Sequence, residues 1–300
     1  MKIGRFIRIL IILVLVSFSI YFLTKNWYDF KKYNIKINYE YLILSFLVAI
    51  LSQVLLALAW QVIMESLNQK ISFVNSMRIY FISQIIRYIP GKIWLIGGRI
   101  YLCGKEGISS VHASLGIVLE LLLISLSNII LIILTSGLVN IKYFILITAI
   151  GLTVVYPKNI NILVNIVLRI LKRKPLKLTI SYINILKVII LYIIFWLLLG
   201  VAFFLITQSI YKIDIILLPR IIGIHSLAWL LGFLSFLTPA AIGVREGLLS
   251  LFLKPYLPIS LAIGISILAR IIVTISELTI LAASLISRKI ENRRAHILYD

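Results

Sequence analysis

Long apolar stretches recur along the whole chain and are separated by short polar segments. Each is close to the roughly 20 residues that an α-helix needs to cross the hydrocarbon core of a bilayer. The pattern predicts an all-α polytopic membrane protein with about six spanning helices. The expected spans are residues 9–24, 41–64, 109–137, 141–157, 180–209 and 259–286.

Two further segments, residues 65–108 and 210–258, do not read as single crossings. The first must begin and end on one side of the membrane, and the second must begin and end on the other. Each contains an apolar piece, a break at a proline and then a short helix. The proline and glycine residues at these breaks are Pro90, Gly91, Pro239 and Gly243.

The features that follow each break repeat at an offset of about 150 residues. An arginine comes first, Arg99 in one copy and Arg245 in the other. A long helix comes next, with a charge near its middle, Glu120 in the first copy and Arg270 in the second. Paired broken helices in two halves are typical of the central site of a transporter. The pattern therefore predicts two re-entrant hairpins in an inverted-topology repeat; two unrelated proline-kinked helices are the alternative.

The chain is predicted to form a single integral membrane domain over residues 1–300. It divides into a first helix with an outer loop, a first repeat half, a connecting helix with a basic cytoplasmic linker, and a second repeat half with a basic tail. These parts cover residues 1–40, 41–140, 141–179 and 180–300. The N-terminal apolar run is not followed by small residues suited to cleavage, which indicates a retained helix rather than a signal peptide.

Basic residues dominate the charge, with 30 Lys and Arg against 10 Asp and Glu. In a soluble protein this excess would suggest nucleic acid, but here the cations lie mostly in loops and at helix ends, as the positive-inside rule predicts. We expect the protein to lie in the cell inner membrane with both termini in the cytoplasm, because the N-terminus, the linker 158–177 and the tail are all basic. The loop 25–40 would then face outward, and its four lysines argue against this orientation at that point. Anionic lipid headgroups are the expected partner, and nucleic acid is not.

No metal or cofactor is expected from the sequence. The lone Cys103 has no metal-ligand neighbours, and neither His112 nor His225 has a partner at metal-ligand spacing. All three read as ordinary interior or helix residues.

The cations near the two breaks are candidate contacts for a lipid phosphate. Lys92 and Arg99 flank the first break, and Arg245 follows the second. A phosphate stripped of water needs charged or N–H partners, and guanidinium groups supply them in a fixed fork. The alternative is that these side chains only extend to the membrane interface.

Four further charges are predicted at membrane depth: Glu120, Glu246, Arg270 and Glu277. A charge at the middle of a spanning helix costs about 2.5–3.5 kcal/mol on insertion scales, so such residues are functional candidates by default. We read them as an intramembrane charge network. The alternative is a structural ion pair, for example between Glu120 and Arg270.

These residues resemble a known family. Pro90-Gly91-Lys92 with Arg99 and Glu120, and Thr238-Pro239 followed by Gly243-Val244-Arg245-Glu246-Gly247, look like the transmembrane region of lysylphosphatidylglycerol synthases, a flippase-like domain family. The resemblance covers about residues 5–290. It implies movement of an anionic or polyprenyl-linked lipid between leaflets in cell-envelope biosynthesis. In the full synthases a cytosolic domain transfers an amino acid from aminoacyl-tRNA to phosphatidylglycerol, and the short tail here is not expected to hold that domain.

Two positions depart from the family pattern. Ala240-Ala241 stands where the family usually has Gly-Gly, which bears on how closely a ligand can approach the backbone. Leu121 follows Glu120 where many relatives place arginine, so a partner for Glu120 must come from another segment.

Three function classes follow. The first is a lipid flippase or translocator that holds a phosphate headgroup while the hydrocarbon chain stays in lipid. The second is a membrane transferase of the phosphatidylglycerol lysyltransferase or lipid-linked glycosyltransferase type; it is less favoured, because the outer side offers only Asp29, Glu40 and Asp214 as acids. The third is a non-catalytic membrane partner of such a transferase, with which the sequence is equally compatible.

Overall fold

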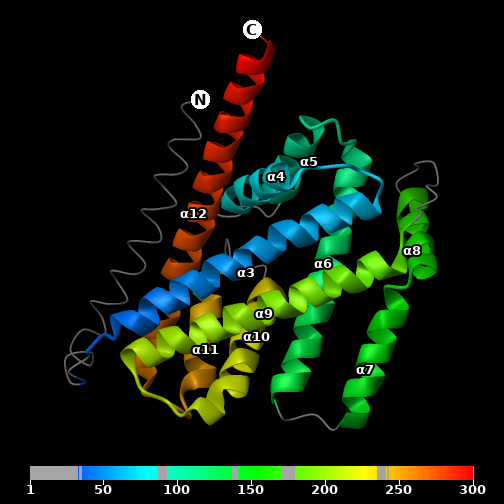
Figure 1. The fold of residues 1–300 in the computed structure, drawn as a ribbon. Helices are drawn as coiled ribbons and strands as arrows, with labels where there is room; N and C mark the ends of the chain where they lie inside the picture. Colours follow the sequence, from blue (N-terminus) through cyan, green and yellow to red (C-terminus); the bar gives the residue numbers. More distant parts are fainter. Residues whose placement is uncertain are drawn as a thin grey trace.

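The computed structural model describes residues 33, 36–86, 93–136, 141–170, 180–234, 241 and 243–299. All regular structure in these ranges is helical (Figure 1). In chain order the elements are α3 Tyr39–Ser66, α4 Phe73–Ile86, α5 Ile93–Gly104, α6 Ser110–Ser136, α7 Ile141–Val154, α8 Pro157–Ile170, α9 Tyr182–Ile210, the 3₁₀ turn η1 Ile215–Leu217, α10 Leu218–Leu234, α11 Val244–Leu253 and α12 Ile259–Tyr299. The expected first span, residues 9–24, lies outside the described residues.

Among the described residues, five helices are long and apolar enough to cross a membrane. They are Tyr39–Ser66, Ser110–Thr135, Tyr182–Ile210, Ile215–Leu234 and Ile259–Ser287. A sixth candidate is a broken pair, Thr148–Val154 with Pro157–Ile166, bent by 51°. The prediction of an all-α polytopic membrane protein is therefore confirmed.

Two details differ from the expectation. The segment before the second break forms a helix long enough to be counted among the spans, where the pattern indicated half of a hairpin. The basic linker 158–177 begins as helix α8 rather than as a loop. Lys158, Asn161, Asn165 and Arg169 recur at helical spacing on α8 and interrupt its apolar run, whereas Ile160 and Val164 are buried.

Two sets of four helices make up most of the described fold. The first set is α3, α4, α5 and α6, and the second is α9, α10, α11 and α12. In each set a long helix is followed by two shorter helices and then by another long one. The contacts between the sets are also equivalent, because the last helix of each set packs on the second helix of the other: α6 on α10, and α12 on α4. The N–H of Asn38, at the start of α3, donates to the carbonyl of Ser209, at the end of α9, over 2.8 Å. The two central helices α3 and α9 are therefore antiparallel neighbours.

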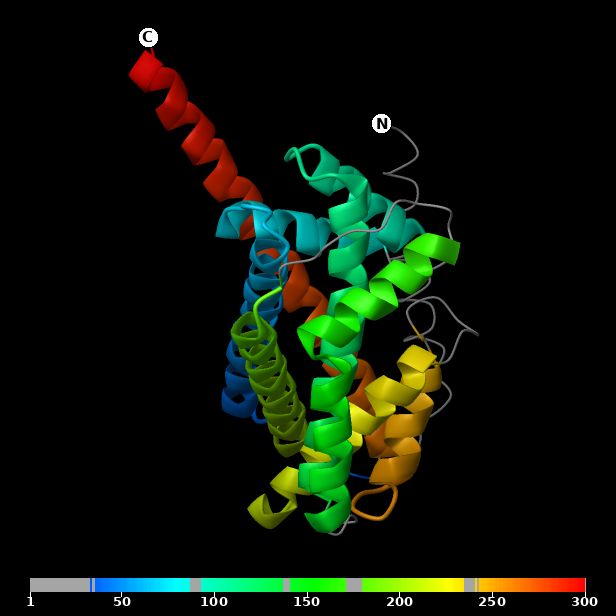
Figure 2. The ribbon, with the colours of Figure 1, turned by 90° about the vertical axis from the view of Figure 1, so that its right-hand side faces the viewer.

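The short helix pairs lie at opposite ends of the bundle. Figures 1 and 2 show α4 and α5 toward one end and α10 and α11 toward the other, while α6 and α12 run in opposite directions between them. This is the arrangement that an inverted repeat predicts.

The helix contacts rely on small residues and on aromatic side chains. A Cβ added at Gly200 of α9 would lie 3.0 Å from the Cα of Ile222, so α9 and α10 approach closely only because that position is glycine. The buried Trp196 donates its indole N–H to the carbonyl of Ile124 over 3.2 Å, and its ring centroid lies 4.6 Å from that of Trp229. One tryptophan of α9 thereby joins α6 and α10.

Helix ends are closed by local hydrogen bonds. The Asn38 side chain accepts from the N–H groups of Glu40 and Tyr41 and caps the start of α3. Asn68, with φ 59°, ends the same helix, and the N–H of Gln69 donates to the carbonyl of Met64, as in a Schellman motif.

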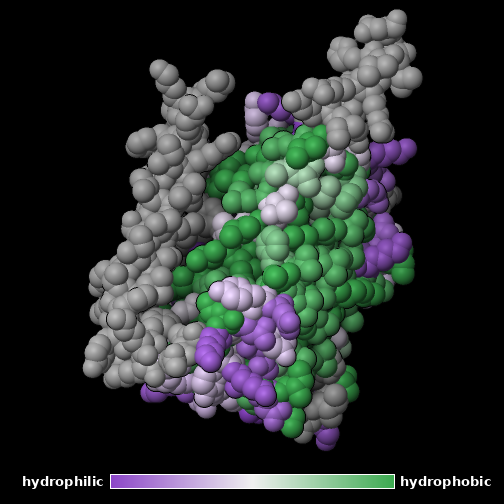
Figure 3. Space-filling view, turned by 60° about the vertical axis from the view of Figure 1, so that its left-hand side comes forward, coloured by the Kyte–Doolittle hydropathy of each residue, from purple (hydrophilic) through white to green (hydrophobic). Residues whose placement is uncertain are grey.

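The outer surface is largely apolar. Figure 3 shows a broad hydrophobic area with hydrophilic residues gathered below it and along its edge. Large apolar side chains such as Leu47, Ile190 and Ile286 are exposed. A continuous surface of this kind is unfavourable in water and suits a lipid environment.

Candidate functional site

Four helices converge on the guanidinium of Arg99 in the first half. Arg99, on α5, is 1% exposed and forms an ion pair with Glu120 of α6. Its Nε donates to the Ser83 hydroxyl of α4 over 2.9 Å. The guanidinium carbon lies 4.7 Å from the ring centroid of Trp60 on α3 and 4.4 Å from that of Tyr80 on α4. The charge is thus held by a carboxylate, a hydroxyl and two aromatic faces.

This geometry tests two expectations from the sequence about the partner of Glu120. The partner of Glu120 does come from another segment, as expected from Leu121. The specific pairing of Glu120 with Arg270 is wrong, because Arg270 pairs with Glu246 instead. The physical reason is that α5 packs on α6 and α11 packs on α12, so each long helix meets the short helix that precedes it.

The second half contains an equivalent ion pair. Arg270 of α12 donates from Nε to one oxygen of the buried Glu246, on α11. The other oxygen of Glu246 accepts the N–H of Gly243 over 2.8 Å, which caps the start of α11. Gly243 has φ 84°, in the left-handed region, so glycine is required at this break.

The two halves contain the same kind of ion pair, with the positions of the positive and negative residues exchanged. In the first, the arginine is on the short helix and the acid is on the long helix; in the second, the acid is on the short helix and the arginine is on the long one. Both pairs tie the helix after a break to the next long helix. A buried charge whose partner is removed is costly, so each pair fixes where its short helix sits.

Arg245 has a different environment from Arg99. It is half-buried on α11, and its Nη2 lies 2.7 Å from Nε2 of His225 on α10, which is fully buried. A guanidinium only donates hydrogen bonds, so Nε2 of the histidine accepts and the proton of the neutral ring is on Nδ1. The ring centroid of Phe203 lies 5.0 Å from that of His225. His225 therefore positions Arg245, a role that the sequence did not indicate because the two residues are 20 apart.

A third ion pair, which sequence reasoning missed, joins α4 to the turn after α5. Arg78 of α4 pairs with Glu106, in the turn after α5, and Asn75 donates to the other oxygen of Glu106 over 2.6 Å. Cys103 lies next to this turn, and burial raises the pKa of its thiol to about 11. The thiol is therefore expected to react slowly.

Several of the other predicted site residues lie outside the described residues: Lys92, Pro90, Gly91 and Pro239. Glu277 is buried on α12, two turns beyond Arg270. Ala241, where the family usually has glycine, has φ 53°, so an alanine here occupies a conformation that favours glycine. Contact of Lys92, Arg99 or Arg245 with a phosphate stays a prediction.

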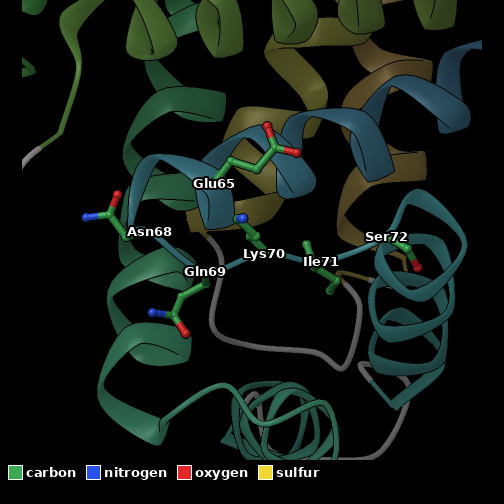
Figure 4. Close-up of a pocket in the computed structure, with 6 residues that line it drawn as sticks. All are labelled: Glu65, Asn68, Gln69, Lys70, Ile71 and Ser72. Atoms are coloured by element: carbon green, nitrogen blue, oxygen red, sulfur yellow. The ribbon is translucent and has the colours of Figure 1, made fainter.

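A pocket lined mainly by polar residues lies at the turn between α3 and α4. It has a volume of about 660 Å³, and Figure 4 shows its side chains arranged along the turn from Glu65 to Ser72. Glu65 accepts from the Gln61 side chain over 2.9 Å. Within the described ranges, no three His, Cys, Asp or Glu side chains are grouped as metal ligands.

The fold and these sites define a class: a polytopic helical membrane protein with two sets of four helices, in each of which a buried ion pair joins the third helix to the fourth. Comparison with protein families gives the particular family. Residues 5–280 match the family described as the lysylphosphatidylglycerol synthase TM region, and because this is most of the 300 residues, the chain belongs to that family. None of the curated proteins compared matches the chain.

Proposed function

We propose that this protein moves an anionic or polyprenyl-phosphate-linked lipid between the leaflets of the cell inner membrane during envelope biosynthesis. The observation that carries the proposal is the occurrence of two helix pairs at opposite ends of the bundle, each with a buried or half-buried arginine on its second helix, Arg99 on α5 and Arg245 on α11. Transporters with inverted repeats bind their substrates where such broken segments meet. An arginine beside a break can accept a lipid phosphate as it leaves water.

The two arginines would act differently in this mechanism. Arg245 is half-buried, with its Nη2 beside a neutral histidine, so part of this residue is open to an approaching phosphate. Arg99 is enclosed and paired with Glu120, so a phosphate reaches it only if it competes with that carboxylate. We therefore assign the first headgroup contact to Arg245.

The proposal includes a membrane orientation. Both termini face the cytoplasm, residues 65–108 are reached from inside, and residues 210–258 are reached from outside. The basic tail and linker support this orientation through the positive-inside rule.

Cysteine labelling tests the orientation. On a Cys103→Ser background, Lys105→Cys is expected to react with a membrane-impermeant maleimide only after the membrane is opened, whereas Lys212→Cys reacts in intact cells. Both lysines are exposed in the structure, so neither substitution removes a buried contact. Labelling of position 105 from outside, or of position 212 only from inside, would overturn the inverted arrangement in the membrane.

Translocation itself is tested with purified protein in liposomes. Fluorescent phosphatidylglycerol in the inner leaflet should become accessible to an impermeant quencher, and fluorescent phosphatidylcholine should do so more slowly. Protein-free liposomes give the background, and the assay is run with and without an imposed pH gradient and membrane potential. Wild-type protein that moves no phosphatidylglycerol and no polyprenyl phosphate under either condition would contradict the proposal and favour a role as a transferase partner.

A further inference from the structure

The contact between Arg245 and His225 differs in one respect from the ion pairs. Arg99 is held by the carboxylate of Glu120, whereas Nη2 of Arg245 lies 2.7 Å from the ring nitrogen Nε2 of a histidine. Unlike a carboxylate, a histidine becomes a cation when it takes up a proton. The contact therefore joins a permanent cation to a group that can become a second one.

The surroundings of His225 contain no negative charge to balance a second cation. The ring is fully buried, and in the described part of the chain its Nδ1 has no hydrogen-bond partner. Phe203 of α9 contacts the ring, and Arg245 is the charged group that acts on it. Glu246 follows on α11, but both of its oxygens already accept hydrogen bonds. The connection between α10 and α11, residues 235–243, contains no charged residue.

The helices packed on α10 supply no free carboxylate either. These helices are α6, α9 and α11. Glu120 of α6 is paired with Arg99, and Tyr192 of α9 interacts electrostatically with that same pair. The other titratable residues of α6, α9 and α10 lie in the first two turns of their helices: His112, Tyr182, Lys187 and Arg220.

These surroundings determine when the histidine can be charged. A proton at Nε2 removes the acceptor for Arg245 and places two cations in contact. Like charges this close repel strongly where water is excluded, so the ring is neutral when no ligand is bound. A phosphate beside both groups reverses this balance, because its oxygens accept hydrogen bonds from both cations.

We propose that a phosphate at Arg245 is bound together with a proton, which His225 takes up. This inference rests on the proposed translocation and adds an energy source, the cotransport of a proton with an anionic lipid. The proton comes from solvent, and the new N–H bond forms at Nε2. The hydrogen bond that Nε2 accepted from Arg245 is then replaced by hydrogen bonds that both side chains donate to phosphate oxygens.

Calorimetry measures the proton directly. Purified protein in detergent is titrated with dioctanoyl-phosphatidylglycerol near pH 7 in Pipes and in Tris, two buffers that differ in ionisation enthalpy. The difference between the two binding heats gives the number of protons taken from the buffer. We expect up to about one proton per bound lipid, and binding that tightens by up to about tenfold for each unit by which the pH falls. The lipid is a phosphodiester that stays ionised near this pH, so the proton is bound by the protein.

His225→Gln removes the proton site and keeps an acceptor for Arg245. Glutamine has an amide oxygen near the position of Nε2 but takes up no proton in this pH range. The variant should bind the lipid with the same heat in both buffers. His112→Gln is the matched control, because His112 is also a helical histidine and its Nδ1 lies 2.7 Å from the hydroxyl of Ser109. It should take up as many protons as wild type.

The coupling and the proposed function fail through different results. Saturable binding to wild type with equal heats in the two buffers would overturn the coupling and leave the phosphate site intact. Proton uptake that persists in His225→Gln would also overturn it. If that variant does not fold, wild-type protein in liposomes decides: acid on the side that the lipid leaves should speed its movement, and equal rates under either gradient would overturn the coupling. The absence of saturable lipid binding would contradict the proposed function, and the coupling with it.

Discussion

Glu120→Gln is expected to lower the free energy of unfolding by about 3–5 kcal/mol, because it leaves the guanidinium of Arg99 buried without its counter-charge. Arg99 cannot turn toward solvent, since Trp60 and Tyr80 lie against its guanidinium and Ser83 holds its Nε. Thermal unfolding in detergent, followed by intrinsic fluorescence, measures the loss. Glu40→Gln is the control, because Glu40 is an exposed acid in the first turn of α3.

A double substitution separates stability from transport. Replacing a buried ion pair by apolar residues of similar size is often neutral or stabilising, so Arg99→Met with Glu120→Leu should recover most of the lost stability. If the pair also serves translocation, the double variant stays inactive although it is folded. A Glu120→Gln variant that melts like wild type and yet moves no lipid would contradict the structural role and assign the carboxylate to transport.

Arg245→Lys is expected to reduce translocation of phosphatidylglycerol by about tenfold to a hundredfold while the melting temperature changes little. A lysine keeps the charge but has a single nitrogen, which cannot hold His225 and a phosphate in the fork that arginine provides. The expected size follows from the roughly 1.5–3 kcal/mol that a hydrogen bond to a charged group contributes. The liposome assay gives the rate, and native mass spectrometry gives the amount of retained phosphatidylglycerol.

The matched control for this prediction is Arg220→Lys. Arg220 is an exposed arginine on α10 that donates to the Tyr256 hydroxyl over 3.3 Å. The Arg220→Lys variant is expected to translocate lipid at the wild-type rate. Wild-type translocation and lipid retention in Arg245→Lys as well would show that Arg245 only extends to the interface, and the phosphate site would lose its support.

The sequence by itself determined the membrane helices. A helix satisfies its own backbone hydrogen bonds, so in lipid an apolar run of sufficient length is enough to specify it, without reference to the rest of the chain. The expected spans at 41–64, 109–137, 180–209 and 259–286 agree with helices of the structure for this reason. The positions of the breaks and of the charges are equally local, so Gly243 and the arginines could be singled out.

Only the tertiary structure decided which charges meet. Glu120 lies 21 residues from Arg99 and 150 from Arg270, and nothing in the spacing favours either partner. The choice depends on which faces α5 and α11 turn toward the long helices that follow, and packing sets those faces. His225 acquired its role in the same way. A hydrogen bond or an ion pair between helices is a property of two surfaces, and the sequence of one helix specifies only its own.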